Sequence, residues 1–331
     1  MALILRLVIA VLLGGGFLAT LWATAGLVRR RTHRVQLLLA IVAWIAGFFI
    51  LTVAATILVG EATLLAMSML EQELLQVTSL VAALVALWRI WGVPRLDAVG
   101  LGWPAGDRRR AWRDAGFGLL LGPLAVGVML IAGLLGGWDR IVGVAPLPGL
   151  LANLGSGVVL FLLVAVFEEL SMRGCLFALV ARVAGLPAGV VVSVVLFALL
   201  HLANPGAGAT AILGVGLAGA VFVLAFVRSG ALWLPIAFHL SWDWAETSLY
   251  GFPDSGIPPT AALQLAIDGH APEWATGGTF GPEASACVIL ALGLAAGAIW
   301  LYTRRRAGRI GLFPAGTPER SAPGAIAREI A

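Results

Sequence analysis

Long, nearly unbroken apolar runs dominate the sequence, and short polar or charged segments separate them. Several runs reach about 20 residues, the length at which a helix crosses a hydrocarbon layer of roughly 30 Å. They must be helical, because lipid offers no hydrogen-bonding partner to a free backbone N–H or C=O group. Their apolar positions are continuous rather than alternating, which argues against an outer-membrane barrel. The pattern predicts an all-α, polytopic membrane bundle of about eight to nine transmembrane helices.

The individual runs divide the chain into membrane spans and connecting loops. The expected spans are Ile4–Val28, Leu37–Val59, Leu74–Val93, Gly116–Gly137, Leu150–Val183, Ala188–Leu202, Ala207–Val227, Ala231–Tyr250 and Ala284–Tyr302. Four regions follow: N-terminal helices with an arginine-rich loop (1–114), a core of helices (115–252), an outer loop with the last helix (253–306), and a tail (307–331). The tail is rich in Pro, Gly and Arg, and we expect it to be disordered.

Charge is scarce and its placement predicts the orientation in the membrane. Only 11% of the residues are charged, and all 21 basic residues are arginine. Positively charged loops stay in the cytoplasm. If the N-terminus lies outside the cell, all the arginines at span ends face the cytoplasm. They are Arg29–Arg31 and Arg34, Arg89, Arg95, Arg108–Arg110 and Arg113, Arg182, Arg228, and Arg304–Arg306 with Arg309. The C-terminus is then cytoplasmic. The lysine-free composition suggests a bacterial cytoplasmic membrane, and no basic stripe indicates a nucleic-acid partner.

Ionisable residues inside the spans gather in one part of the chain. They are Glu168, Glu169, Arg173, His201, His239, Asp243 and, near a span end, Glu246. A charged side chain within a bilayer costs about 2.5–3.5 kcal/mol on insertion scales, so such residues usually serve a function or a tight ion pair. We therefore interpret this cluster as a site, while the role of Glu246 stays open.

The spacing of these residues indicates which side chains can meet. Glu169 and Arg173 are four apart and can form a buried ion pair on one helix face. Glu168 is turned by about 100° from Glu169 and can face another helix. His239 and Asp243 also share a face. Counted along the helices, Glu168, His201 and His239 lie at a similar membrane depth, roughly 16–21 Å from their span ends.

Three short motifs resemble those of one known family. They are EELSMR (Glu168–Arg173), FALLH (Phe197–His201) and HLSWD (His239–Asp243). Together they resemble the CAAX-protease and bacteriocin-processing (CPBP, Rce1-like or ABI) intramembrane peptidases, over about Gly149 to Gly251.

The resemblance implies a membrane-embedded peptidase and assigns the roles. Glu168 and His201 would activate a water, and His239 and Asp243 would stabilise the oxyanion. Glu169 and Arg173, with Phe197, would support the helix or position the substrate. The family usually has asparagine at the position of Asp243, and an ionised aspartate cannot donate a hydrogen bond. Asp243 would therefore be protonated, orient His239 or bind a metal.

Three function classes fit these residues. The first is an endopeptidase without a cofactor, because amide hydrolysis needs an activated water, a proton donor and oxyanion donors. The second is a metal-dependent hydrolase in which Glu168, His201, His239 and Asp243 hold zinc. The third is a non-enzymatic scaffold, an immunity-type protein or a transporter. The expected partners are the lipid bilayer and a membrane-associated peptide or protein, possibly lipidated.

Overall fold

The computed structural model describes residues 2–59, 67–92, 99–103, 107–259 and 262–305. The expected tail, Arg95, Arg306 and Arg309 lie outside these residues. The principal helices are α1 (Ala2–Arg29), α2 (His33–Val59), α4 (Met69–Trp91), α5 (Arg108–Gly136), α6 (Leu147–Glu169), α7 (Ala178–Ala184), α8 (Leu186–Leu200), α9 (Ala209–Ser229), α10 (Trp233–Asp243) and α12 (Cys287–Thr303).

The prediction of an all-α polytopic membrane bundle is confirmed. Seven described helices are long and apolar enough to cross a membrane, and α12 is a shorter apolar helix. The longest of the seven, Leu147–Ala184, joins α6 to α7 through the π-helical segment η3 (Leu170–Phe177). α10 likewise continues into a second π-helical segment, η5 (Trp244–Tyr250).

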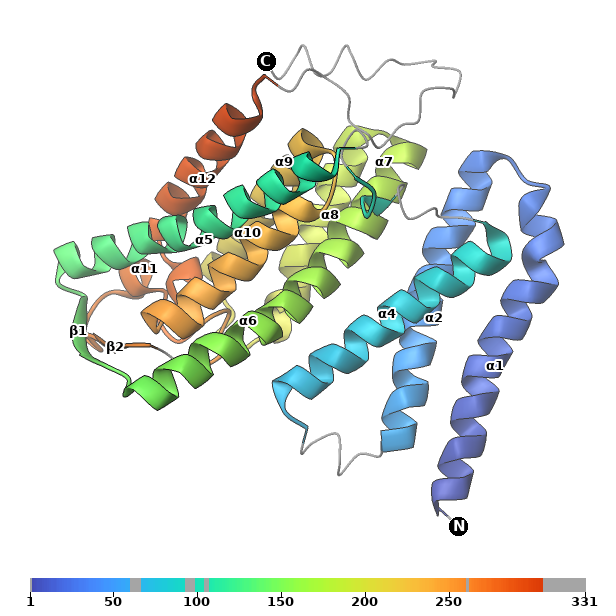
Figure 1. Cartoon of the computed structure of the whole chain (residues 1–331), viewed down its shortest axis with the longest axis horizontal. Helices are drawn as coiled ribbons and strands as arrows, with labels where there is room; N and C mark the ends of the chain where they lie inside the picture. Colours follow the sequence, from blue (N-terminus) through green and yellow to red (C-terminus); the bar gives the residue numbers. More distant parts are fainter. Residues whose placement is uncertain (1, 60–66, 93–98, 104–106, 260–261, 306–331) are drawn as a thin grey trace.

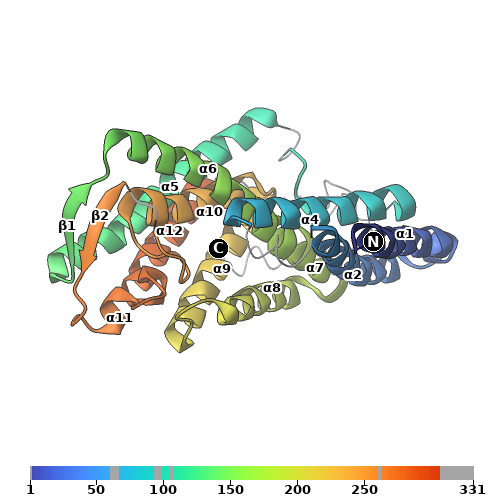
Figure 2. The ribbon, with the colours of Figure 1, turned by 90° about the horizontal axis from the view of Figure 1, so that it is seen from below.

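Two groups of helices make up the molecule (Figure 1). α1, α2 and α4 pack against one another at one end, as the view from below also shows (Figure 2). The remaining helices form the main bundle, which α4 joins through α6 and α2 joins through α7. The main bundle holds the helices that carry the predicted site: α6, α8 and α10.

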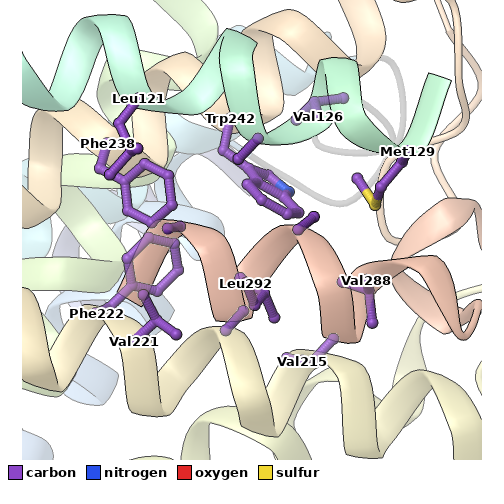
Figure 3. Packing of buried hydrophobic residues seen from close by; sticks show 14 of the residues in the cluster. Leu121, Val126, Met129, Val215, Val221, Phe222, Phe238, Trp242, Val288 and Leu292 are labelled. Carbon is purple, nitrogen blue, oxygen red and sulfur yellow. The ribbon is translucent and has the colours of Figure 1, made fainter. Parts of the chain in front are cut away.

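α10 is held in the main bundle by close packing against α5. A Cβ atom at Gly118 of α5 would lie 2.8 Å from the backbone nitrogen of Phe238 on α10, so only glycine permits this approach. Ser241 on α10 donates a hydrogen bond to the Gly118 carbonyl at 3.0 Å. Small residues and interhelical hydrogen bonds of this kind hold membrane helices together. Phe238 and Trp242 then pack into the apolar core beside Leu292 of α12 (Figure 3).

A small two-stranded sheet, whose first strand follows α5, was not expected. Strand β1 (Asp139–Val144) pairs antiparallel with β2 (Leu263–Ile267) of the loop that follows α10. Asp139 begins β1 opposite Ile267 and is 6% exposed. Burial raises the pKa of Asp139 from 3.8 to about 6. The same loop contains α11 (Glu273–Thr276) and the 3-10 turn η6 (Pro282–Ala284).

Candidate active site

The two adjacent glutamates stand where α6 changes into the π-helical η3. α6 ends at Glu169, and η3 begins at Leu170. π-helical turns inside longer helices are rare and often lie at functional sites. The side chain of Glu168 is 24% exposed, whereas that of Glu169 is completely buried. Glu168 is therefore partly exposed at the protein surface, whereas its neighbour is not.

Glu169 forms the predicted ion pair with Arg173. The Arg173 Nη1 atom lies 2.8 Å from Glu169 Oε1, and both side chains are fully buried. The other guanidinium nitrogen, Nη2, donates to the Gly219 carbonyl of α9 at 3.2 Å. The guanidinium carbon lies 4.2 Å from the ring centroid of Phe197. Arg173 thus links η3 to both α8 and α9.

The same Glu169 oxygen also binds His239 of α10. His239 Nδ1 lies 2.9 Å from Glu169 Oε1. Because that oxygen already accepts from Arg173, it acts as an acceptor here too, and Nδ1 carries the proton. A chain of contacts from Arg173 through Glu169 therefore fixes the orientation of the His239 ring, as a carboxylate bound to the other ring nitrogen does for many functional histidines.

The opposite nitrogen of His239 faces two further carboxylates. Nε2 lies 3.6 Å from Glu168 Oε2 and 3.4 Å from Asp243 Oδ2. Both distances exceed the usual length of a direct hydrogen bond. The ring itself stacks on Phe222, with centroids 4.5 Å apart and planes inclined by 22°. His239 is 6% exposed, so this contact between an imidazole and three carboxylates is almost wholly within the protein.

His201 stands at the end of α8, where the chain turns into the 3-10 turn η4 (His201–Ala203). Its Nδ1 atom lies 2.8 Å from the Phe197 carbonyl, which can only accept, so Nδ1 donates. Nε2 is then the nitrogen left for a ligand or a water. α8 is tied to the glutamate-bearing helix by Ser193, which donates to the Met172 carbonyl of η3 at 3.0 Å.

The predicted site residues thus form one connected group, with His201 at its margin. Glu168, Glu169 and Asp243 all contact the imidazole of His239. His201 joins them through Phe197, whose ring centroid lies 4.9 Å from that of His201 and 6.3 Å from that of His239. A cavity of about 600 Å³ lies elsewhere, among residues of α1, α2 and Trp91, and none of the predicted site residues lines it.

Three acidic residues near the site were not singled out by the sequence reasoning. Glu73, near the start of α4, lies within electrostatic reach of Glu168. Asp254 and Glu283 lie in the segment after α10, where they approach Glu246. Among the described residues, only the group of Glu246, Asp254 and Glu283 brings three ligand atoms within 4.8 Å of one another. The four residues expected for a zinc site do not form such a group, and metal dependence of the site stays a prediction.

Residues 150–245 match the family model described as Type II CAAX prenyl endopeptidase Rce1-like. This segment is Rce1-like. The predicted resemblance is therefore confirmed, and the Rce1-like segment contains the three motifs and every residue of the connected group. Comparisons with curated proteins and with solved structures found no match. The long apolar helices support an integral membrane protein, and residues 150–245 are similar to a CAAX-type intramembrane protease.

Proposed function

We propose that this chain is an intramembrane endopeptidase that cleaves a membrane-associated peptide with a water activated by Glu168 and His201. The observation that carries the proposal is the geometry at His239. One ring nitrogen is fixed by Glu169, and the other faces Glu168 and Asp243. A partly exposed carboxylate can act as a general base, and a buried, oriented imidazole beside it can donate to an oxyanion.

The first step is attack by water on the scissile carbonyl carbon. Glu168 accepts one proton of the water, and the unprotonated Nε2 atom of His201 holds the water through its other proton. The new C–O bond forms as the carbonyl π pair moves onto oxygen. The Glu168 side chain is 24% exposed, so a substrate or a water can approach it from outside the protein.

The second requirement is a donor for the oxyanion. With Nδ1–H of His239 donating to Glu169, a second proton on Nε2 makes the ring a cationic donor. The neighbouring carboxylates supply its counter-charge. Asp243 lies 3.4 Å from Nε2. In this proposal it orients the proton on Nε2 and does not itself donate a hydrogen bond to the substrate. When the intermediate collapses, the C–N bond breaks and the proton held by Glu168 passes to the leaving amine.

Glu169 and Arg173 act as positioning residues in this proposal. Neither side chain is exposed, so neither can contact a substrate directly. The family description names prenylated CAAX peptides, and a lipidated peptide end is one substrate of the proposed class. A membrane-anchored peptide is favoured over a soluble one, because the Rce1-like segment includes three of the long apolar helices.

The proposal is tested by comparing the membrane peptides of cells that carry the wild-type chain or Glu168→Gln. Glutamine keeps the shape of the side chain but cannot accept the proton. Glu273→Gln, an exposed change in α11, is the matched control for loss of one carboxylate. Products that disappear only with Glu168→Gln support the proposal. Unchanged products would favour a scaffold, and products lost on chelation in the wild type would favour the metal-dependent hydrolase.

A further inference from the structure

Three buried carboxylates form a second polar cluster beside the proposed active site. Glu246 lies in η5, Asp254 in the loop after it, and Glu283 in η6. Each offers a carboxylate oxygen within 4.8 Å of the others. Their exposed fractions are 0%, 6% and 7%, in that order. Residues far apart in sequence thus converge at one buried point outside the connected group around His239.

The carboxylate of Glu283 accepts hydrogen bonds from two side chains, whereas that of Glu246 accepts none from the described residues. Trp242 Nε1 donates to Glu283 Oε1 at 3.2 Å, and Ser255 Oγ donates to Glu283 Oε2 at 2.5 Å. Both carboxylate oxygens of Glu246 lack a hydrogen-bond partner, although the residue is completely buried. An unsatisfied buried carboxylate is costly and needs an explanation.

Within the part of the chain that the structure describes, no ion pair brings positive charge to the cluster. The ion pairs formed by the described residues include none of Glu246, Asp254 and Glu283. All three carboxylates are buried. A buried group of this kind requires either protons or a bound cation to neutralise it.

We propose that Glu246, Asp254 and Glu283 bind a divalent cation, and that Ca²⁺ fits them best. The ligand atoms are all carboxylate oxygens, which suit hard cations such as Ca²⁺ rather than zinc. Ligand oxygens within 4.8 Å of one another can surround a central ion at the usual Ca²⁺–oxygen distance of about 2.3–2.6 Å. Glu246 then receives a partner that it lacks among the described residues.

The cation would brace the loop that covers the end of α8. Asp254 and its neighbour Ser255 belong to a tight turn in which Ser255 has a positive φ of 47°. The Ser255 carbonyl accepts a hydrogen bond from Asn204, at 3.0 Å, just after η4. Gly256 packs so closely on the Pro205 carbonyl that a side chain there would collide with it. Binding at the cluster therefore fixes the loop against the segment that carries His201.

Terbium luminescence tests this site directly in the full chain, purified in detergent and freed of metal with a chelator. Tb³⁺ binds at Ca²⁺ sites, and Trp242 is placed to sensitise its emission through the contact with Glu283. The wild type should show saturable Tb³⁺ emission that Ca²⁺ displaces, and Ca²⁺ should raise its thermal unfolding temperature. Glu246→Gln should lose both responses, whereas Glu273→Gln should keep them.

Two further measurements keep the proposal open to refutation if Glu246→Gln fails to fold. Asp254→Asn removes a second ligand and should weaken Ca²⁺ binding at least tenfold. Trp242→Phe removes the sensitiser but no ligand, so it should lose emission and keep the Ca²⁺-induced shift in unfolding temperature. The proposal is overturned if the wild type shows no saturable binding, or if Glu273→Gln loses binding as Glu246→Gln does. It is also overturned if only lower pH, and not Ca²⁺, stabilises the wild type.

Discussion

Replacement of Arg173 by methionine should destabilise the protein strongly, because it would leave Glu169 buried without its counter-ion. The two side chains are fully buried and lie 2.8 Å apart. Removal of one partner of such a pair costs about 3–5 kcal/mol, since the remaining charge is left in a medium of low dielectric. The guanidinium also lies over Phe197 and Phe222, at 4.2 and 4.9 Å from their centroids.

The double variant Glu169→Gln with Arg173→Met should be much less affected than the sum of the two single variants predicts. It removes both charges together, and glutamine can still accept a hydrogen bond from His239 Nδ1. Contacting residues couple by about 0.5–3 kcal/mol, and we expect a value near the upper end of that range. Reversible unfolding of the wild type, both single variants and the double variant in detergent micelles gives the coupling energy.

The activity of the same four proteins separates orientation from stability. If Glu169 orients His239, then Arg173→Met should lower kcat at temperatures where the protein is still folded, with a smaller effect on KM. Additive costs in the unfolding cycle would refute the account of a buried, interdependent pair. A folded Arg173→Met variant with full kcat would refute the proposed orientation of the imidazole.

Three other predictions concern the helix contact, the small sheet and the departure from the family motif. Gly118→Leu should lower stability by about 1–3 kcal/mol through overpacking against the Phe238 backbone. Gly116→Leu is the control, because the space around its Cβ is open and its stability should not fall. Thermal unfolding of both variants will test the prediction. Burial raises the pKa of Asp139 from its ordinary value of 3.8 to about 6, so the fold disfavours the ionised carboxylate. The wild type should therefore lose stability from pH 4 to pH 7 relative to Asp139→Asn. Unfolding temperatures measured over this pH range will test the prediction. Asp243→Asn should keep peptide cleavage, because the amide oxygen can still accept from His239, while Asp243→Ala should lose it.

Local spacing in the sequence predicted much of this arrangement. The continuous apolar runs predicted the helices, since only a helix satisfies its backbone in lipid. The interval of four residues predicted the Glu169–Arg173 pair and the approach of His239 to Asp243. Such inferences succeed because helix geometry alone fixes which side chains share a face.

Other features depend on packing between distant segments and left no local pattern. The hydrogen bond between His239 and Glu169 joins residues 70 positions apart. The π-helical segments begin directly after Glu169 and Asp243, where neither proline nor glycine marks a change of helix type. Asp254 and Glu283 lie in the long connection between η5 and α12, where no periodicity of the sequence indicates that they approach Glu246.

The most direct test of Glu168-dependent hydrolysis adds purified protein back to membranes that contain the Glu168→Gln variant. The account predicts that purified wild-type protein restores the missing peptide products, and that purified Glu168→Gln protein of equal unfolding temperature restores none. Restoration by both proteins would contradict it, because cleavage would then proceed without the carboxylate that is proposed to activate the water.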